Sequence, residues 1–247
     1  MAGHSKWANI KHRKAKEDAK RGKVFTKLIR ELTIAAKMGG GDPNSNPRLR
    51  AAIDAAFASN MTKDTVDRAI KRGAGGLEGQ DVEEVTYEGY APSGVAVIVE
   101  CMTNNRNRTV AEVRHAFSKC GGNLGTDGSV SYQFSRKGVI SFAKGVDEHK
   151  LLDVALEAGA DDLVSLDDGS VDVYTSFEAF SAVKASLLKQ NFTPDAAEVM
   201  MVSSNMIDVN GEDVAKVIKL LDMLEDLDDV QKVHSNANFN EDDLALL

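Results

Sequence analysis

Aromatic side chains, cysteine and long apolar runs are all scarce in this sequence of 247 residues. Aromatic residues make up 6% of it, with one Trp and four Tyr, which argues against a protein that stacks many single-stranded bases on aromatic platforms. Cys101 and Cys120 lie far apart and outside any Cys-x-x-Cys pattern. We therefore expect both to be reduced thiols in the core of a cytoplasmic protein. No stretch reaches the ~20 apolar residues of a membrane span, and the N-terminus lacks the apolar segment of a secretory signal.

Patterns that would indicate an enzyme or a metal site are also missing. The five histidines do not have the spacing of metal ligands, and there is no Gly-x-Ser-x-Gly nucleophile elbow. The Gly-rich run 121–128 follows a predicted helix and has no Gly-Lys-Ser/Thr ending, so it predicts a structural turn. We interpret the carboxylates between 222 and 229 as a solvated helix end. The sequence therefore predicts no catalytic residue, metal, cofactor or small-molecule substrate.

Charge is distributed very unevenly along the chain. Residues 1–75 carry 17 Lys/Arg and 7 Asp/Glu, a net charge of +10, whereas the remainder carries 13 and 31, a net charge of −18. Such asymmetry indicates a basic module with a polyanionic partner. The acidic remainder would be repelled by phosphates and is expected to stay away from them.

The N-terminal part is predicted to be a basic arm followed by a small helical module. The first 22 residues hold too little apolar surface for a packed helix, so we expect a partly ordered arm. Apolar residues then recur at helical spacing in three segments, which end near Gly39, Phe57 and Gly73. The Gly-rich stretch 73–79 indicates a flexible linker and a domain boundary.

After this linker the apolar period changes from helical spacing to two, which predicts strands. Residues 82–134 are expected to form a hairpin of two strands with its turn at residues 91–93, then a helix and a strand over Val130–Phe134. Residues 135–204 follow the order β-α-β-β-α-β, the split βαβ signature of ferredoxin-like folds, with the second helix expected over Ser176–Gln190. The remaining helix and strand before residue 235 cannot form a domain alone. We therefore predict an α+β multidomain protein with a helical domain (1–78), a discontinuous α/β domain (79–134 and 205–247) and an inserted α/β domain (135–204).

Several long motifs are similar to those of the YebC family. They are the opening Met-Ala-Gly-His-Ser-Lys-Trp-Ala-Asn-Ile-Lys-His-Arg-Lys and the segments 39–43, 46–50, 87–90, 105–117 and 120–129. The resemblance covers essentially the whole chain and implies a three-domain protein with a helical N-terminal domain and two α/β domains. Bacterial members are described as probable transcriptional regulators that bind DNA. Other members, including a mitochondrial activator of cytochrome oxidase subunit translation, act on the ribosome.

The candidate nucleic-acid contacts are cations, with one aromatic and one histidine among them. Arginine and lysine neutralise phosphates and release counterions, an effect that does not depend on base sequence. Trp7 is expected either to contact a base or to pack on the helical domain, and His12 could donate one hydrogen bond to a phosphate. Arg106 and Arg108 are expected at a helix N-terminus, where free N–H groups favour anions, and Asn107 is the expected cap. The full set is Lys6, Trp7, Lys11, His12, Arg13, Lys14, Lys16, Lys20, Arg21, Lys23, Lys71, Arg72, Arg106 and Arg108.

Three functional hypotheses fit this pattern. The leading one is a DNA-binding transcriptional regulator, acting as a monomer in the cytoplasm, whose contacts are mainly to the phosphate backbone. The second is a ribosome-associated translation factor that grips RNA with the same basic surface. The third is an interaction module whose acidic domains bind a protein. Charge alone does not separate the first two.

Overall fold

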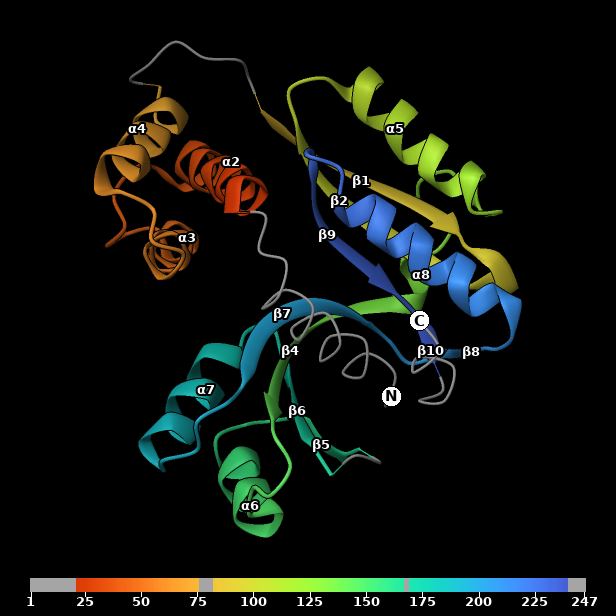
Figure 1. Cartoon of the computed structure of the whole chain (residues 1–247). Helices are drawn as coiled ribbons and strands as arrows, with labels where there is room; N and C mark the ends of the chain where they lie inside the picture. Colours follow the sequence, from red (N-terminus) through yellow and green to blue (C-terminus); the bar gives the residue numbers. More distant parts are fainter. Residues whose placement is uncertain (1–20, 76–81, 167–168, 240–247) are drawn as a thin grey trace.

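The computed structural model describes residues 21–75, 82–166 and 169–239. Most of the predicted arm, residues 76–79 of the predicted linker and the C-terminal residues from 240 therefore lie outside the described residues. The chain forms three groups of elements: the N-terminal helices, a sheet that carries α5 and α8, and a second sheet that carries α6 and α7 (Figure 1). This arrangement is the α+β architecture that the sequence predicts.

The N-terminal helices form a module with its own apolar core. They are α2 (Arg21–Gly39), α3 (Pro47–Ala58) and α4 (Lys63–Gly73). The Asn46 side chain caps α3 by accepting a hydrogen bond of 3.0 Å from the Leu49 backbone N–H, and Pro47 occupies the first helical position. The three predicted helices are confirmed, and their core consists of Leu32, Ala35, Ala36, Leu49, Ala52, Ala56, Met61, Val66 and Ala69.

The first sheet takes its strands from both sides of the predicted insertion. Its order is β3-β1-β2-β9, and all neighbouring strands are antiparallel. The strands are β1 (Glu83–Tyr90), β2 (Ala96–Thr103), β3 (Asn123–Leu124) and β9 (Val230–Ser235). The short 3₁₀ helix η1 (Pro92–Gly94) joins β1 to β2, in place of the simple turn that the sequence suggests.

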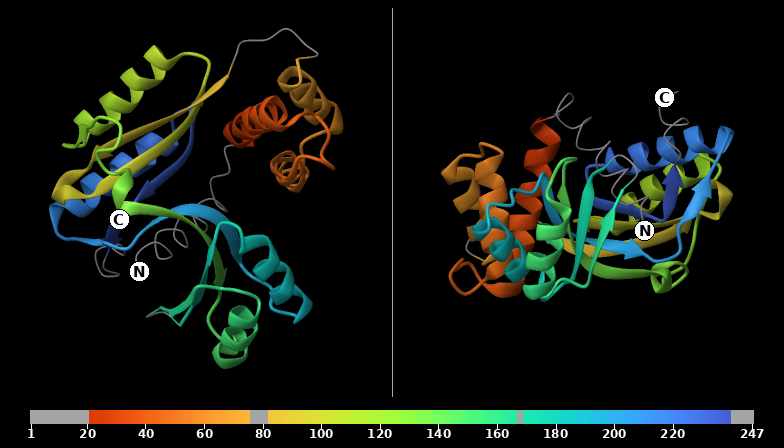
Figure 2. Two further views of the ribbon diagram at one scale, coloured as in Figure 1. Left: turned by 180° about the vertical axis from the view of Figure 1, so that it is seen from behind. Right: turned by 90° about the horizontal axis from the view of Figure 1, so that it is seen from below.

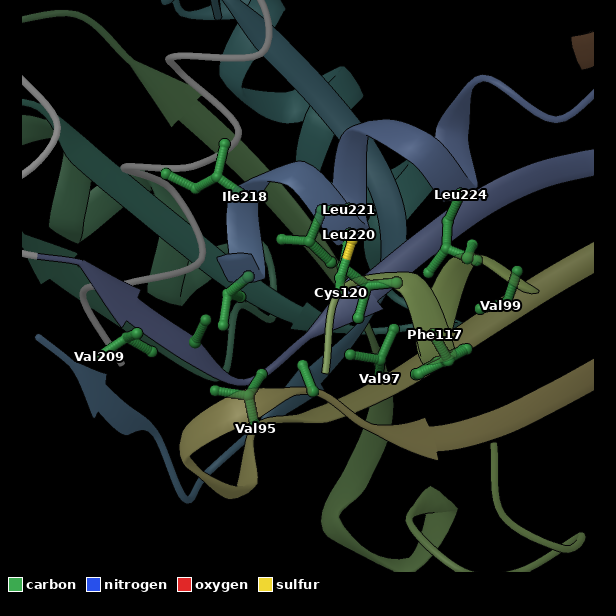
Figure 3. Close-up of a cluster of buried hydrophobic side chains, with 14 of the residues drawn as sticks. Val95, Val97, Val99, Phe117, Cys120, Val209, Ile218, Leu220, Leu221 and Leu224 are labelled. Carbon is green, nitrogen blue, oxygen red and sulfur yellow. The ribbon is translucent and has the colours of Figure 1, made fainter. Parts of the chain in front are cut away.

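Two helices cover one face of this sheet, α5 (Arg106–Lys119) and α8 (Glu212–Glu225). Figure 3 shows Leu220, Leu221 and Leu224 of α8 close to Val97 of β2 and Phe117 of α5. Alternate β2 residues point into this core, as expected for a strand with one face against helices. Cys101 and Cys120 belong to the same core and form no disulfide, which confirms the prediction of buried thiols.

The second sheet is formed entirely by residues within 134–203. Its order is β5-β6-β4-β7, again antiparallel, with α6 and α7 packed on one face. The elements are β4 (Phe134–Phe142), α6 (Glu148–Glu157), β5 (Asp162–Ser165), β6 (Val171–Ser176), α7 (Phe180–Lys189) and β7 (Ala196–Ser203). The predicted β-α-β-β-α-β order is confirmed. The division of the chain into independently folding domains stays a prediction.

The two sheets meet where β7 passes close to β9. Lys232 of β9 donates to the Val199 carbonyl at 2.9 Å, and the Met201 N–H donates to Nδ1 of His234 at 3.4 Å. Figure 2 shows β4 and β7 running as long curved strands from the region of the first sheet into the second. Two short strands, β8 (Ile207–Val209) and β10 (Ala237–Phe239), form a separate parallel pair. In the sequence, β8 precedes α8 and β10 follows β9.

The structure corrects some predicted boundaries. Residues 131–133 form the 3₁₀ helix η2, so the strand expected over Val130–Phe134 is wrong, and β4 begins only at Phe134. The helix expected from Ser176 begins at Phe180, because the Ser176 hydroxyl accepts a hydrogen bond from the Ala179 N–H and closes a turn first. In the described part of the chain, each helix is too short or too polar to cross a membrane.

Candidate nucleic-acid interface

The candidate cations that the structure describes fall into three groups. The candidates from Lys6 to Lys20, together with Trp7 and His12, lie outside the described residues. Arg21 and Lys23 begin α2, and Lys71 and Arg72 end α4. Arg106 and Arg108 lie in the first turn of α5. The described candidates therefore lie at three different helix ends.

Lys71 and Arg72 are exposed in the last turn of α4, a helix that buries Val66 and Ala69 on its other side. Neither side chain makes an ion pair with a described residue. Cations in the last turn of a helix are stabilised by the partial negative charge of the helix end. These two side chains are therefore held on a packed helix with their charged groups in solvent, where a phosphate could reach them.

Three cations of α2 face the acidic end of α8, which comprises residues 225–229. Lys23, Lys27 and Arg30 have helical spacing of four and three residues, so they share one face, here called the α2 basic face. Lys23 donates to the Asp226 carbonyl at 2.8 Å and lies 2.9 Å from its carboxylate. Lys27 donates to the Glu225 carbonyl at 3.1 Å, and Arg30 donates to the Asp228 carbonyl. The Glu225 and Asp226 carbonyls end α8, where cations are stabilising, and the Asp228 carbonyl lies just beyond it.

Asp229 is the most buried carboxylate of this acidic end, with a side chain only 1% exposed. Arg30 approaches one carboxylate oxygen at 2.7 Å, and Arg108 approaches the other at 2.7 Å. The hydroxyls of Thr109 and Thr103 donate to the second oxygen at 2.7 and 3.2 Å. Burial alone would raise the pKa of Asp229, but these hydrogen bonds and charges lower it below its ordinary value.

Arg106 and Arg108 do not form a shared anion site at the start of α5. The cap is Asn105, whose side chain accepts from the Arg108 N–H at 3.1 Å, so the expectation of Asn107 as cap is wrong. Arg106 pairs with Glu83 at 2.9 Å, whereas Arg108 turns toward Asp229. Both guanidinium groups are thus matched by carboxylates of the same chain.

A groove of about 460 Å³ lies beside this helix start, between α5 and β1. Its wall includes the carboxylates of Glu84, Glu88 and Asp127 and a single cation, Arg106. The Glu88 carboxylate accepts backbone hydrogen bonds of 2.8 to 3.0 Å from the turn at residues 128–131. Since carboxylates outnumber cations, the groove is a poor place for a phosphate.

Several polar contacts join the helical module to the rest of the chain. Besides the α2 basic face, Arg48 of α3 bridges Glu31 at 2.7 Å and Glu84 of β1 at 2.5 Å. These carboxylates raise the pKa of Arg48 above its ordinary value, although burial opposes them. Every buried apolar cluster of described residues belongs either to the module or to the remainder, and none contains both.

The sequence did not predict this charged contact. Asp229 was interpreted as part of a solvated helix end, which is wrong because the side chain is buried among two arginines and two threonines. Lys23 and Arg108 were expected to be open to phosphate, yet each is paired with a carboxylate of the acidic end. The helical spacing of Lys23, Lys27 and Arg30 could have indicated a common partner, but not which one.

Comparison with known proteins identifies the chain. Residues 5–76 match the family description "TACO1/YebC protein N-terminal domain", and residues 82–237 match "TACO1/YebC second and third domain". The chain belongs to the TACO1/YebC family. This confirms the resemblance seen in the sequence motifs.

Relatives of this TACO1/YebC chain match it over all or most of its length. A protein of Pseudomonas fluorescens named "Probable transcriptional regulatory protein" is 65% identical over 100% of both chains. The "Transcriptional regulatory protein PmpR" of Pseudomonas aeruginosa is 64% identical over 100% of both chains. A crystal structure of a conserved hypothetical protein from Aquifex aeolicus is 50% identical, with a TM-score of 0.80 over 91% of this chain and 93% of that one. The fold described above is therefore that of the TACO1/YebC family.

Among the described residues there is no group of three or more His, Cys, Asp or Glu side chains placed to hold a metal ion. Burial raises the pKa of the Cys101 thiol to about 12, with the nearby Asp229 and Glu100 adding to the effect. A thiol with so high a pKa is protonated at neutral pH and is a poor nucleophile. Cys101 is therefore poorly suited to nucleophilic chemistry.

Proposed function

We propose that this protein is a non-enzymatic DNA-binding transcriptional regulator that grips the phosphate backbone with its basic N-terminal part. The observation that carries the proposal is the separation of charge, +10 over residues 1–75 against −18 over the remainder. A duplex presents a dense line of phosphates, and cations that neutralise it gain free energy by releasing counterions. The names of the Pseudomonas relatives support the same function.

The proposed contact surface consists of the cations from Lys6 to Arg21, with Trp7 and His12, and the exposed Lys71 and Arg72 of α4. Lys23 joins this surface only when its pair with Asp226 is broken. Arg106 and Arg108 are left out because they are paired with Glu83 and Asp229. We place the protein in the cytoplasm as a monomer, and because cations on α4 are not accompanied by Asn or Gln base readers, we expect modest sequence specificity.

The test is a parallel titration of three partners across a salt series: promoter DNA, unrelated duplex DNA and purified ribosomes. A regulator with backbone contacts binds both duplexes at physiological salt, with a steep and similar salt dependence and a small preference for the promoter. Binding to ribosomes at physiological salt, with only weak and sequence-blind DNA binding, would replace this proposal by the translation-factor hypothesis.

A second test compares duplex binding by a variant whose arm cations are neutralised with binding by a control variant of equal net charge. A variant with the seven cations from Lys6 to Arg21 changed to Gln should lose most duplex binding. The control variant carries the same number of Lys/Arg→Gln changes in the acidic remainder, at Arg114, Lys119, Lys144, Lys150, Lys184, Lys189 and Lys219. Equal binding by the two variants would show that net charge alone governs association, and the proposed surface would be abandoned.

A further inference from the structure

The α2 basic face is already occupied by groups that resemble a phosphate chain. Lys23 meets a carbonyl and a carboxylate of Asp226, Lys27 meets the Glu225 carbonyl, and Arg30 meets the Asp228 carbonyl and the Asp229 carboxylate. A nucleic-acid backbone offers a row of cations a similar kind of partner, namely closely spaced phosphate oxygens that carry negative charge. The acidic end of α8 thus uses the same chemistry that a polyphosphate ligand would use.

We infer that the acidic end of α8 is an internal competitor for nucleic acid, which holds the α2 basic face until phosphates displace it. This inference rests on the proposed function and names the regulation of the same surface. In the closed arrangement Lys23, Lys27 and Arg30 are unavailable. In the open arrangement all three add to the cations of the arm and of α4.

The construction of the contact favours exchange over permanent docking. The module has a complete core of its own, and no buried apolar cluster of described residues joins it to the remainder. Lys23 and Asp226 are partly exposed, with side chains 34% and 60% accessible. Ion pairs of such exposure are individually weak and are screened by salt. Parting the two surfaces therefore exposes charge and leaves the cores intact.

The contact has two ends that differ in burial and in the number of partners that hold the carboxylate. The end at Asp229 is here called the firm end, and the end at Asp226 the soft end. At the firm end, Asp229 is held by Arg108, Thr103 and Thr109 as well as by Arg30, so it stays in place when α2 leaves. At the soft end, Asp226 is exposed and meets α2 through Lys23. The carboxylate that competes most strongly is thus pre-positioned by the α/β part of the chain and does not depend on the module for its orientation.

Competition of this kind has a measurable signature. A protein that binds only in its open state shows a dissociation constant divided by the fraction of molecules that are open. Weakening the acidic end raises this fraction and frees cations of α2 for the ligand. Each additional phosphate contact makes the slope of log K against log salt steeper by about 0.9, which a purely structural contact would not do.

The experiment compares two full-length variants of equal net charge, Asp226→Asn/Asp229→Asn and Asp213→Asn/Asp161→Asn. Asp213 and Asp161 pair with Lys216 and Lys137, away from α2, so their variant removes the same charge without touching the acidic end. The probe is a fluorescent 20-base-pair duplex of arbitrary sequence, titrated by anisotropy from 50 to 300 mM salt. We expect the first variant to bind about 3- to 10-fold more tightly than the control, with a slope steeper by about one to three.

Loss of the buried Asp229 charge could prevent the double variant from folding. The single variant Asp226→Asn is expected to fold in that case, because Asp226 is exposed, and it provides the same test. It should show a smaller gain of about 2- to 3-fold and a slope steeper by about one. Identical affinity and slope in the acidic-end and control variants, with binding still abolished by arm neutralisation, would overturn the internal competitor and leave the proposed function standing. Equally weak binding by every variant, the arm-neutralised one included, would instead overturn the proposed function.

Discussion

Asp229 shows how much a single carboxylate can depend on its surroundings. It lies between two arginines and two threonine hydroxyls, and its backbone carbonyl accepts a 2.8 Å hydrogen bond from the Met102 N–H. A buried charge is tolerated only when partners replace the water that it loses. Arg30 belongs to α2 and Arg108 to α5, so the side chain joins the module to the α/β part of the chain.

We expect Asp229→Ala to lower the free energy of unfolding by about 3 kcal/mol, because two guanidinium groups and two hydroxyls lose their acceptor. Urea denaturation followed by circular dichroism measures the change. The neighbouring Asp228→Ala is the control, since Asp228 is exposed and uses its backbone carbonyl toward Arg30. Its effect should stay within about 0.5 kcal/mol, and similar losses in both variants would contradict the role given to Asp229.

Glu88 predicts a dependence of stability on pH. Burial would raise its pKa, but the backbone N–H donors of Val130, Gly128 and Ser131 outweigh it and lower the pKa below the ordinary 4.5. A carboxyl whose pKa is lower in the folded state stabilises the protein above the unfolded-state pKa, and this contribution is lost as pH falls through the folded-state value. We therefore expect wild-type stability to decline below about pH 4.5 and Glu88→Gln to decline less steeply in urea unfolding between pH 3 and 6. Parallel curves for the two proteins would exclude Glu88 as a source of the acid sensitivity.

At the scale of elements, the helical module depends on a close approach of α4 to α2. A Cβ atom at Gly73 would lie 2.1 Å from the Thr33 carbonyl oxygen and 2.9 Å from the Cβ of Ala36. Real contacts are longer, so any side chain at position 73 must push the end of α4 away from α2. Gly73 thus serves packing within the module as well as ending the helix.

Gly73→Ala is expected to destabilise the module by about 1 to 3 kcal/mol. Hydrogen exchange of amides in α2 and α4 reports on the module separately from the two sheets, which should keep their protection. Gly41→Ala is the matched control, because its new methyl group would lie 3.3 Å from Cγ2 of Ile70 and 3.4 Å from the Cβ of Ala74, so these neighbours need to move by only a few tenths of an ångström. If the Gly73 variant retained wild-type protection, the close approach of the two helices would not be a constraint.

Much of the element order was predictable because it rests on local patterns. The apolar spacing around Leu28 and Leu32 marks α2, and alternating residues such as Val97 and Val99 mark β2. Elements of two or three residues, β3, β8 and β10, carry too little periodicity to be recognised. The missed start of α7 has the same origin, since a side-chain hydrogen bond of Ser176 decides it.

At the scale of the whole molecule, contacts between distant parts of the chain escape prediction. Lys23 and Asp226 are 203 positions apart, and the sequence around either residue does not predict that the two form a pair. The sequence correctly shows where opposite charges accumulate, but their pairing depends on how the module lies against α8. For the candidate site, then, residue types were predictable, whereas their availability to a ligand was not.

Salt should loosen the module in the absence of any ligand. The contacts that join it to the remainder include Lys23–Asp226 and Arg48–Glu84, both partly exposed ion pairs that counterions screen. We expect small-angle X-ray scattering to give a larger radius of gyration at 1 M than at 50 mM sodium chloride. The Asp226→Asn/Asp229→Asn variant should already be expanded at low salt, and a radius that does not change with salt in either protein would show that the module is fixed.

The interrupted first sheet also determines the order in which the protein can mature during synthesis. Strand β2 pairs with β9, and the apolar face of β2 packs against α8. Both β9 and α8 follow the second sheet in the sequence, so they are synthesised only after that sheet is complete. The inserted sheet can close as soon as β7 emerges, while an unpaired strand edge and a bare patch of valines remain upstream. Nascent chains released before residue 212 should therefore be prone to aggregation, because their second sheet is complete whereas their first sheet lacks strand β9 and helix α8.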